Sequence, residues 1–193
     1  AAAIKESAAS HAQTWPKGVE YRILADQSVD IRNMIRELQN NIFTALLLVV
    51  CVLLFFMGTR NSLFVALAIP LSMLISFAVL DVLGFTLNMV VLFSLILALG
   101  MLVDNAIVVV ENIYRHLELG YSRKDAAIAG TKEVAVAIVA STATTVAAFF
   151  PMVFWGGIMG EFMGYLPKTV IIVLVSSLVV AILILPVLTS RLM

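Results

Sequence analysis

Five long apolar stretches, separated by short polar segments, make up most of the chain after residue 40. A helix that crosses a bilayer needs roughly 20 mainly apolar residues, at about 1.5 Å of rise per residue. All five stretches are near that length, so we predict five transmembrane helices. The predicted spans are residues 41–57, 62–80, 86–110, 134–155 and 169–190. Inside the second span we expect Pro70 to kink the helix and not to break it, because neighbouring helices can satisfy the freed carbonyl.

The first 28 residues have a different pattern, with no apolar run. Ile4–Thr14 is compatible with a short helix, and Val19–Ala25 alternates apolar and polar residues as a half-buried strand does. So short a segment seldom folds alone, because it buries too little apolar surface. We therefore interpret residues 1–28 as an extracytoplasmic α/β remnant of a larger domain. From Val29 an amphipathic helical pattern continues into the first span.

Composition supports a membrane protein: 62% of the 193 residues are hydrophobic and 12% are charged. Soluble domains have about 45–50% apolar and about 25% charged residues. We therefore expect an all-α membrane protein whose transmembrane domain is residues 29–193. The 12 basic and 12 acidic residues cancel, which gives no reason to expect nucleic acid as a partner. Cys51 has no second cysteine to pair with, His11 and His116 are expected to be exposed and without metal-ligand spacing, and no cofactor or metal is expected.

The loop between the third and fourth spans, residues 111–133, predicts the orientation. It carries a concentration of charge that includes Arg115, His116, Arg123 and Lys124. Because cytoplasmic loops are enriched in Lys and Arg, we expect this loop and the C-terminus inside, and the N-terminal segment outside. The four side chains are most simply a solvated face near lipid headgroups.

The same loop contains a helix-start signal. Ser122 and Asp125 have the spacing of a capping box, with Asp in place of the more usual Glu or Gln. We therefore predict a short helix through Ala126–Gly130, along the membrane face before the fourth span begins.

Asp104 is the residue most in need of a functional explanation, because it lies inside an apolar span. An Asp at the centre of a membrane helix costs about 2.5–3.5 kcal/mol on insertion scales. A carboxylate kept there is most often a carrier of protons or ions, although hydrogen bonding to a neighbouring helix is the simpler alternative. Gly100, one turn earlier, would let such a helix approach closely. Glu111 continues the same face, where a charge that reaches the membrane surface is the more ordinary explanation.

Three further polar residues lie near this position in the predicted helices. Asn105 points about 100° away from Asp104 and is expected to form hydrogen bonds between helices. Ser141 and Thr145 lie one turn apart in the fourth span and either line a polar path or bond back to their own helix. No lysine or arginine occurs within any of the five spans, so a cationic partner for Asp104 would have to come from elsewhere. The chain contains no Gly-x-Ser-x-Gly motif, no phosphate loop and no second intramembrane Asp, so we expect no enzyme.

These residues resemble a known family. The stretch from Gly100 to Asn112, Gly-Met-Leu-Val-Asp-Asn-Ala-Ile-Val-Val-Val-Glu-Asn, is similar to the fourth transmembrane helix of resistance–nodulation–division exporters of the hydrophobe/amphiphile efflux branch. Further similar stretches are Leu54–Gly58, Ala68–Ser72, Gly84–Asn88, Ser141–Pro151 and Gly156–Gly160. The resemblance covers about residues 18–193 and implies the end of the first porter half followed by transmembrane helices two to six of twelve.

The resemblance also implies a function. Family members are bacterial inner-membrane homotrimers that use inward proton flow to expel hydrophobic or amphiphilic compounds, with a periplasmic adaptor and an outer-membrane channel. It would make Asp104 and Asn105 part of the proton relay, with Gly100, Glu111, Ser141 and Thr145 as supporting residues, and would place a lysine partner in the second half. It would also make the N-terminal segment periplasmic. Many drug exporters have two adjacent aspartates here, whereas this chain has Asn105 at the second position.

Two alternatives stay open at this point. One is a related proton-driven exporter of protein or lipid, which the porter domain would distinguish. The other is a non-transporting membrane scaffold, in which Asp104 would tolerate replacement by Leu or Asn.

Overall fold

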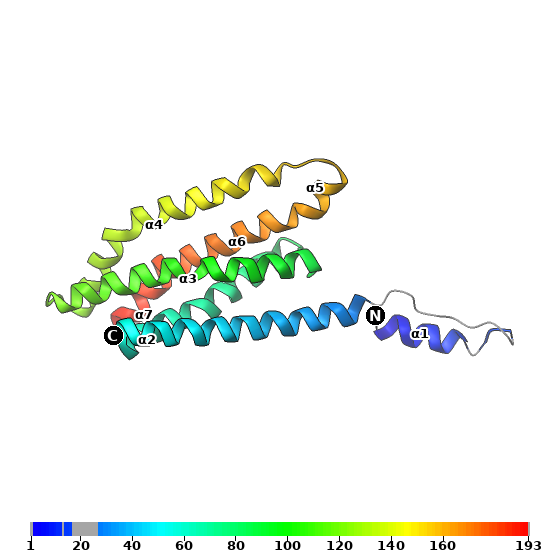
Figure 1. Ribbon diagram of the computed structural model, residues 1–193, viewed down its shortest axis with the longest axis horizontal. Coiled ribbons are helices and arrows are strands. Elements are labelled where there is room, and N and C mark those ends of the chain that lie inside the picture. Colours follow the sequence, from blue (N-terminus) through cyan, green and yellow to red (C-terminus); the bar gives the residue numbers. More distant parts are fainter. Residues whose placement is uncertain (1, 13, 17–26, 193) are drawn as a thin grey trace.

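The computed structural model describes residues 2–12, 14–16 and 27–192, and all regular structure within them is helical. This confirms the predicted all-α membrane fold. The predicted strand at residues 19–25 lies outside the described residues. The elements are α1 Ala2–Ala12, α2 Gln27–Val82, α3 Met89–Glu118, α4 Arg123–Val153, α5 Gly157–Met163, α6 Tyr165–Val179, the π-helix η1 Val180–Ile184, and α7 Leu185–Leu192 (Figure 1).

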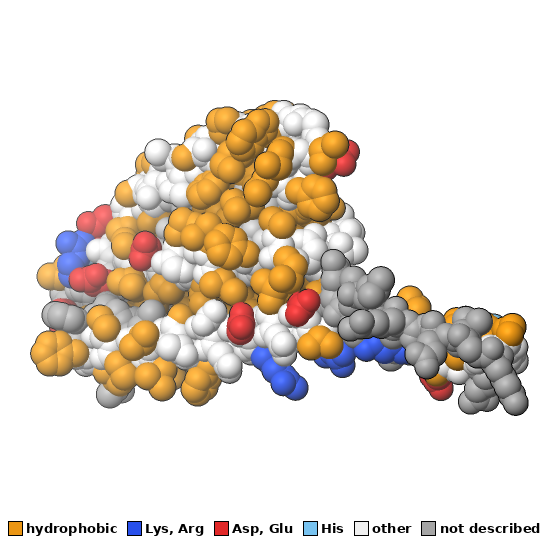
Figure 2. Space-filling model, turned by 45° about the vertical axis from the view of Figure 1, so that its right-hand side comes forward, with side chains coloured by type: hydrophobic (Ala, Val, Ile, Leu, Met, Phe, Trp, Pro, Cys, Tyr) orange, Lys and Arg blue, Asp and Glu red, His pale blue; other side chains and the backbone are white. Residues whose placement is uncertain are grey.

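Within the described residues, five helical segments are long and apolar enough to cross a membrane, as predicted. They are Ser28–Val52, Asn61–Val82, Met89–Glu118, Arg123–Val153 and Gly157–Leu192. Large apolar side chains such as Phe43, Val136 and Ile158 are exposed on these segments. Figure 2 shows a broad area of apolar side chains over the middle of the visible face, which is the surface expected to contact lipid tails.

The first two spans belong to α2 and reverse direction at Gly58 (Figure 1). Gly58 has φ 76° and ψ 176°, and it is the residue with non-helical dihedrals inside α2. A positive φ is accessible to glycine at little steric cost, because glycine has no Cβ. At Pro70 the helix continues, so the predicted absence of a break is confirmed.

Helix α3 lies at the centre of the bundle and contacts α2, α4, α6 and α7. Its fully buried side chains include Leu92, Leu95, Leu102 and Val109. The core forms where these residues meet the apolar faces of α2 and α6. One face of α3 is therefore completely covered, whereas exposed residues lie on its other face.

The predicted extent of the loop between the third and fourth spans, residues 111–133, is wrong. Helix α3 continues to Glu118 and α4 begins at Arg123, so the connection is a tight turn. Ser122 caps α4 as predicted, with its Oγ accepting from the Asp125 amide at 3.3 Å and donating to Asp125 Oδ2 at 2.6 Å. Residues 126–130 are not a separate helix but the first turns of α4, because the cap starts a helix that nothing then interrupts.

The last span contains a wider turn. Residues 180–184 are π-helical, directly before α7, and Pro186 follows within the next turn. Proline cannot donate a backbone hydrogen bond and its ring crowds the preceding turn, so a π-bulge just before it relieves both problems. The predicted span therefore stays helical throughout, with a change of pitch near its end.

Candidate functional site

Asp104 lies near the middle of α3, on the face that the rest of the described chain leaves open. The exposed positions on this face follow one another at intervals of three or four residues, as one side of a helix does. They are Phe93, Leu97, Gly100, Asp104, Val108 and Glu111. A carboxylate at mid-helix thus points toward lipid or toward a part of the protein beyond this chain.

Within the described residues, nothing packs against this face at the level of Asp104. A Cβ added to Gly100 would have no neighbour within 4 Å. Asp104 has no ion pair or hydrogen bond with another described residue. The close helix that we predicted from Gly100 is therefore not supplied by α2, α4 or α6, which contact α3 on its buried faces.

Asn105 faces a different helix. Its Nδ2 donates to Thr142 Oγ1 of α4 at 3.3 Å, and Thr142 is buried. The interhelical hydrogen bond predicted for Asn105 is confirmed. Two adjacent polar residues are thus divided between an open face and a packed one, since successive residues are about 100° apart around a helix.

A second hydrogen bond holds the same stretch of α3 to α6. Ser177 Oγ donates to the Leu102 carbonyl at 2.7 Å, and Ser177 is buried. Sequence reasoning did not single out this serine, because a hydroxyl in a membrane helix often bonds to its own backbone. With Asn105 and Thr142, it fixes α3 between α4 and α6 immediately around Asp104.

The structure does not bring Ser141 and Thr145 to Asp104. Thr145 donates to the Ser141 carbonyl at 3.1 Å within α4, and Ser141 is exposed. The residue of this segment that reaches α3 is Thr142, between them. A hydroxyl that bonds to its own helix has less capacity to line a polar path.

A polar cluster joins α3 and α4 at the end of the bundle that holds their connecting turn. Arg115 Nη2 donates to both carboxylate oxygens of Glu133, at 2.6 and 2.7 Å. Asn112 Nδ2 donates to the Gly130 carbonyl at 2.7 Å and to Glu133 Oε2 at 3.3 Å. Gly130 permits this contact, because an added Cβ would lie 2.8 Å from Ile113 Cα.

His116 belongs to the same cluster, so the prediction that it is exposed is wrong. The residue is 8% exposed, its Nδ1 lies 2.9 Å from the Asn112 carbonyl, and its Nε2 lies 3.4 Å from Glu133 Oε2. Its ring also packs edge-on against Tyr121. Burial follows from the close packing of α3 and α4, which the sequence pattern of a polar loop did not reveal.

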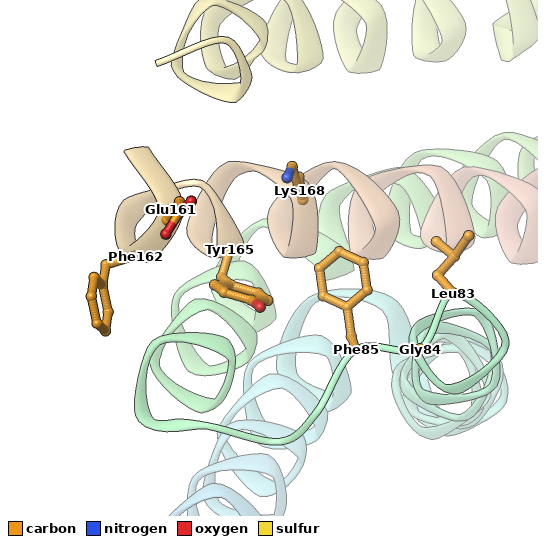
Figure 3. A pocket seen from close by; sticks show the side chains of 7 residues that line it. All are labelled: Leu83, Gly84, Phe85, Glu161, Phe162, Tyr165 and Lys168. Carbon is orange, nitrogen blue, oxygen red and sulfur yellow. The ribbon is translucent and has the colours of Figure 1, made fainter. Parts of the chain in front are cut away.

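The opposite end of the bundle has a cavity of about 540 Å³ between the α2–α3 connection and the start of α6 (Figure 3). The rings of Phe85 and Tyr165 meet edge to face there, with centroids 5.6 Å apart. Glu161 and Lys168 add one charge of each sign to its lining. Aromatic and charged side chains at the end of an apolar bundle are typical of a membrane interface.

The comparisons with a family model and with individual proteins agree with each other. The model of the AcrB/AcrD/AcrF family matches residues 1–193. An uncharacterized transporter of Haemophilus influenzae is 37% identical over 179 residues, which are 92% of this chain and 17% of the relative. The multidrug resistance protein MdtC of Escherichia coli is 34% identical over 175 residues, or 90% of this chain and 17% of the relative.

A further relative, MdtC of Salmonella arizonae, is 35% identical over 172 residues, which are 89% of this chain. The chain spans 17% of the length of these curated relatives. Because the family model matches the chain from end to end, the chain belongs to the AcrB/AcrD/AcrF family of resistance–nodulation–division transporters.

Proposed function

We propose that this chain is part of the proton-relay half of a proton-driven exporter of hydrophobic or amphiphilic compounds, with Asp104 as the proton carrier. The observation that carries the proposal is the position of Asp104, at mid-helix in α3 and on a face that the described chain leaves open. Family membership supports the transport class, and the name of the MdtC relatives supports drugs as a substrate class.

Asp104 needs either a charged partner or a proton. An ionised carboxylate at the centre of a membrane helix is costly unless it is paired or reached by water. No lysine or arginine lies in the predicted spans of this chain. The partner is therefore a cation on another part of the full-length transporter, packed against the open face of α3, and protonation of Asp104 breaks that pair.

The packing of α3 supports a mechanical role for this change. Asn105 and Ser177 tie α3 to α4 and α6 within two residues of Asp104. A change of charge at Asp104 then moves α3, α4 and α6 together relative to the partner helix. Such a rigid unit converts a local protonation into a displacement that a porter domain can use.

Family membership supports a proposal for the full assembly. We propose a homotrimer in the bacterial inner membrane that works with a periplasmic adaptor and an outer-membrane channel. The turn between α3 and α4 and the C-terminal end of the chain lie on the cytoplasmic side, and the N-terminal segment is periplasmic.

Replacing Asp104 by Asn in the full-length transporter tests the proposal. Asn keeps the size and hydrogen-bonding capacity of the side chain but cannot carry a proton at neutral pH. We expect efflux to fall to the level of cells that lack the transporter, with unchanged amounts of trimer in the membrane. Drug accumulation in cells measures the effect.

Glu111→Gln is the matched control, because Glu111 shares the exposed face of α3 but lies near its end. It should keep most of the efflux. Full efflux in the Asp104→Asn transporter would exclude Asp104 as the carrier.

A further inference from the structure

A groove lies between α4 and the last two helical segments, η1 and α7. It is separate from the open face of α3 that carries Asp104. It has a volume of about 330 Å³, within the range of roughly 300–1,000 Å³ that ligand sites occupy. Lys124, Ile128 and Lys132 line one wall, at intervals of four residues along α4. Ile182 and Pro186, from η1 and α7, line the other. Figure 1 places the start of α4 and α7 at the same end of the bundle.

The charge of this groove is positive and uncompensated. The groove is lined by two lysines and by no acidic residue. Neither lysine forms an ion pair with a described residue. The nearby carboxylates are already engaged, since Glu133 binds Arg115 and Asp125 binds the Ser122 hydroxyl. An anion in the groove would therefore meet two free ammonium groups.

The lining of the groove includes a buried hydroxyl that has no hydrogen-bond partner among the described residues. Thr131 is 8% exposed, and its Oγ1 makes no hydrogen bond with a described residue. Elsewhere in α4, Thr144 and Thr145 donate to the carbonyl four residues earlier. A buried polar atom left unpaired is uncommon in folded proteins and points to a missing partner. An oxygen acceptor of a bound ligand would satisfy it.

The residues that line the groove indicate whether the bound anion is a soluble ion or a lipid headgroup. Ile128, Ile182 and Pro186 give the groove an apolar lining beside its lysines. The groove opens on the surface of two membrane-spanning segments, near the ends at which charged residues accumulate. Basic pockets between transmembrane helices at this depth bind anionic headgroups, and the acyl chains extend along the apolar helix surface.

We propose that this groove is a binding site for an anionic phospholipid. The phosphate lies between Lys124 and Lys132, the Thr131 hydroxyl donates to a phosphate oxygen, and the acyl chains follow the apolar wall of Ile182. The site goes beyond the proposed function and does not depend on Asp104. The bound phospholipid would contact both α4 and the π-helical turn of the last span and so hold them together.

Lipid titration of the purified, delipidated full-length transporter, followed by native mass spectrometry, tests the proposal. The probe is palmitoyl-oleoyl phosphatidylglycerol, and phosphatidylcholine with the same chains is the zwitterionic comparison. We expect the first phosphatidylglycerol to bind at least tenfold more tightly. In the K124A/K132A variant this affinity should fall about 25-fold, because each lysine near an anionic group contributes roughly a factor of five.

Three matched variants distinguish binding at this site from general electrostatic attraction. R123A removes an exposed charge beside the groove that does not line it, and should leave the affinity unchanged. Thr131→Val should weaken binding several-fold, whereas Thr131→Ser, which keeps the hydroxyl, should restore it. Equal losses in R123A and K124A/K132A, or no loss in Thr131→Val, would overturn the site.

A soluble competitor decides the source of the phosphate. Glycerol phosphate at millimolar concentration should not displace phosphatidylglycerol, because it lacks the chains that contact the apolar wall. Displacement would show a site for a soluble anion and would contradict a lipid site.

Discussion

Asp104 and Asn105 are neighbours in sequence but belong to different faces of α3. Asn105 is bound to Thr142 across the α3–α4 contact, whereas Asp104 lies on the open face. A second aspartate at position 105 would place a carboxylate against a buried hydroxyl of α4. Asparagine can donate to that hydroxyl without an ionisation cost, so under the proposed function the chain has one proton carrier, Asp104, and one structural amide, Asn105.

The contact between Asn105 and Thr142 predicts a measurable coupling. Hydrogen bonds between membrane helices contribute about 0.6 kcal/mol on average and at most about 1.7 kcal/mol. We expect Asn105→Ala and Thr142→Val to be coupled by an energy in this range in a double-mutant cycle. Unfolding of the full-length transporter by SDS measures it.

Thr144→Val is the control for that cycle, because the Thr144 hydroxyl donates to Ala140 in its own helix. It should show no coupling to Asn105→Ala. Additive effects of the Asn105 and Thr142 changes would mean that the hydrogen bond is not formed in the membrane.

The polar cluster at the α3–α4 turn predicts a ranking of single changes. Asn112→Ala removes a buried amide that donates to the Gly130 carbonyl and should destabilise the protein by about 0.5–1.5 kcal/mol. Glu133→Gln should cost less, because Arg115 and Glu133 are both about half exposed and water competes for them. Thermal unfolding in detergent measures both, and the reverse order would contradict the burial of Asn112.

At the scale of helices, hydropathy predicted the existence of the five spans, whereas their ends depended on local chemistry and packing. The polar residues from Glu111 onward predicted a loop, yet α3 continues because its last turns pack against α4 and bury His116. Hydropathy cannot reveal this, since the cluster of Asn112, His116 and Glu133 satisfies its own polar groups. The Ser122 cap was recognisable because its hydrogen bonds are local.

Glycine substitutions distinguish the packed and the open faces of α3. Gly130→Ala should destabilise both the isolated chain and the full-length transporter by about 1–3 kcal/mol, because the new Cβ meets the Ile113 backbone. Gly100→Ala should be tolerated by the isolated chain, since it meets open space, but should impair the full-length transporter.

Unfolding of both proteins in detergent measures these effects, together with efflux by the full-length variants. A harmless Gly100→Ala in the full-length transporter would indicate that no helix packs against the open face of α3 at this level.

At the scale of the whole molecule, the open face of α3 agrees with the proposal that this chain holds one half of the proton-relay site. The core is complete on the sides of α2, α4 and α6, and the unpaired carboxylate faces outward. The sequence indicated this arrangement by placing an Asp in a span and no lysine or arginine in any span. It could not indicate that Thr142 and Ser177 hold α3 in place, because their roles depend on which face of each helix meets α3.

Under the proposed function, Asp104 binds and releases a proton during transport. Infrared difference spectroscopy of the full-length transporter in proteoliposomes, recorded with and without a proton gradient, observes this directly through the carboxyl C=O band. We predict a band of a protonated carboxyl that changes when the gradient is applied and is missing from the Asp104→Asn protein. Identical difference spectra for the two proteins would contradict the account.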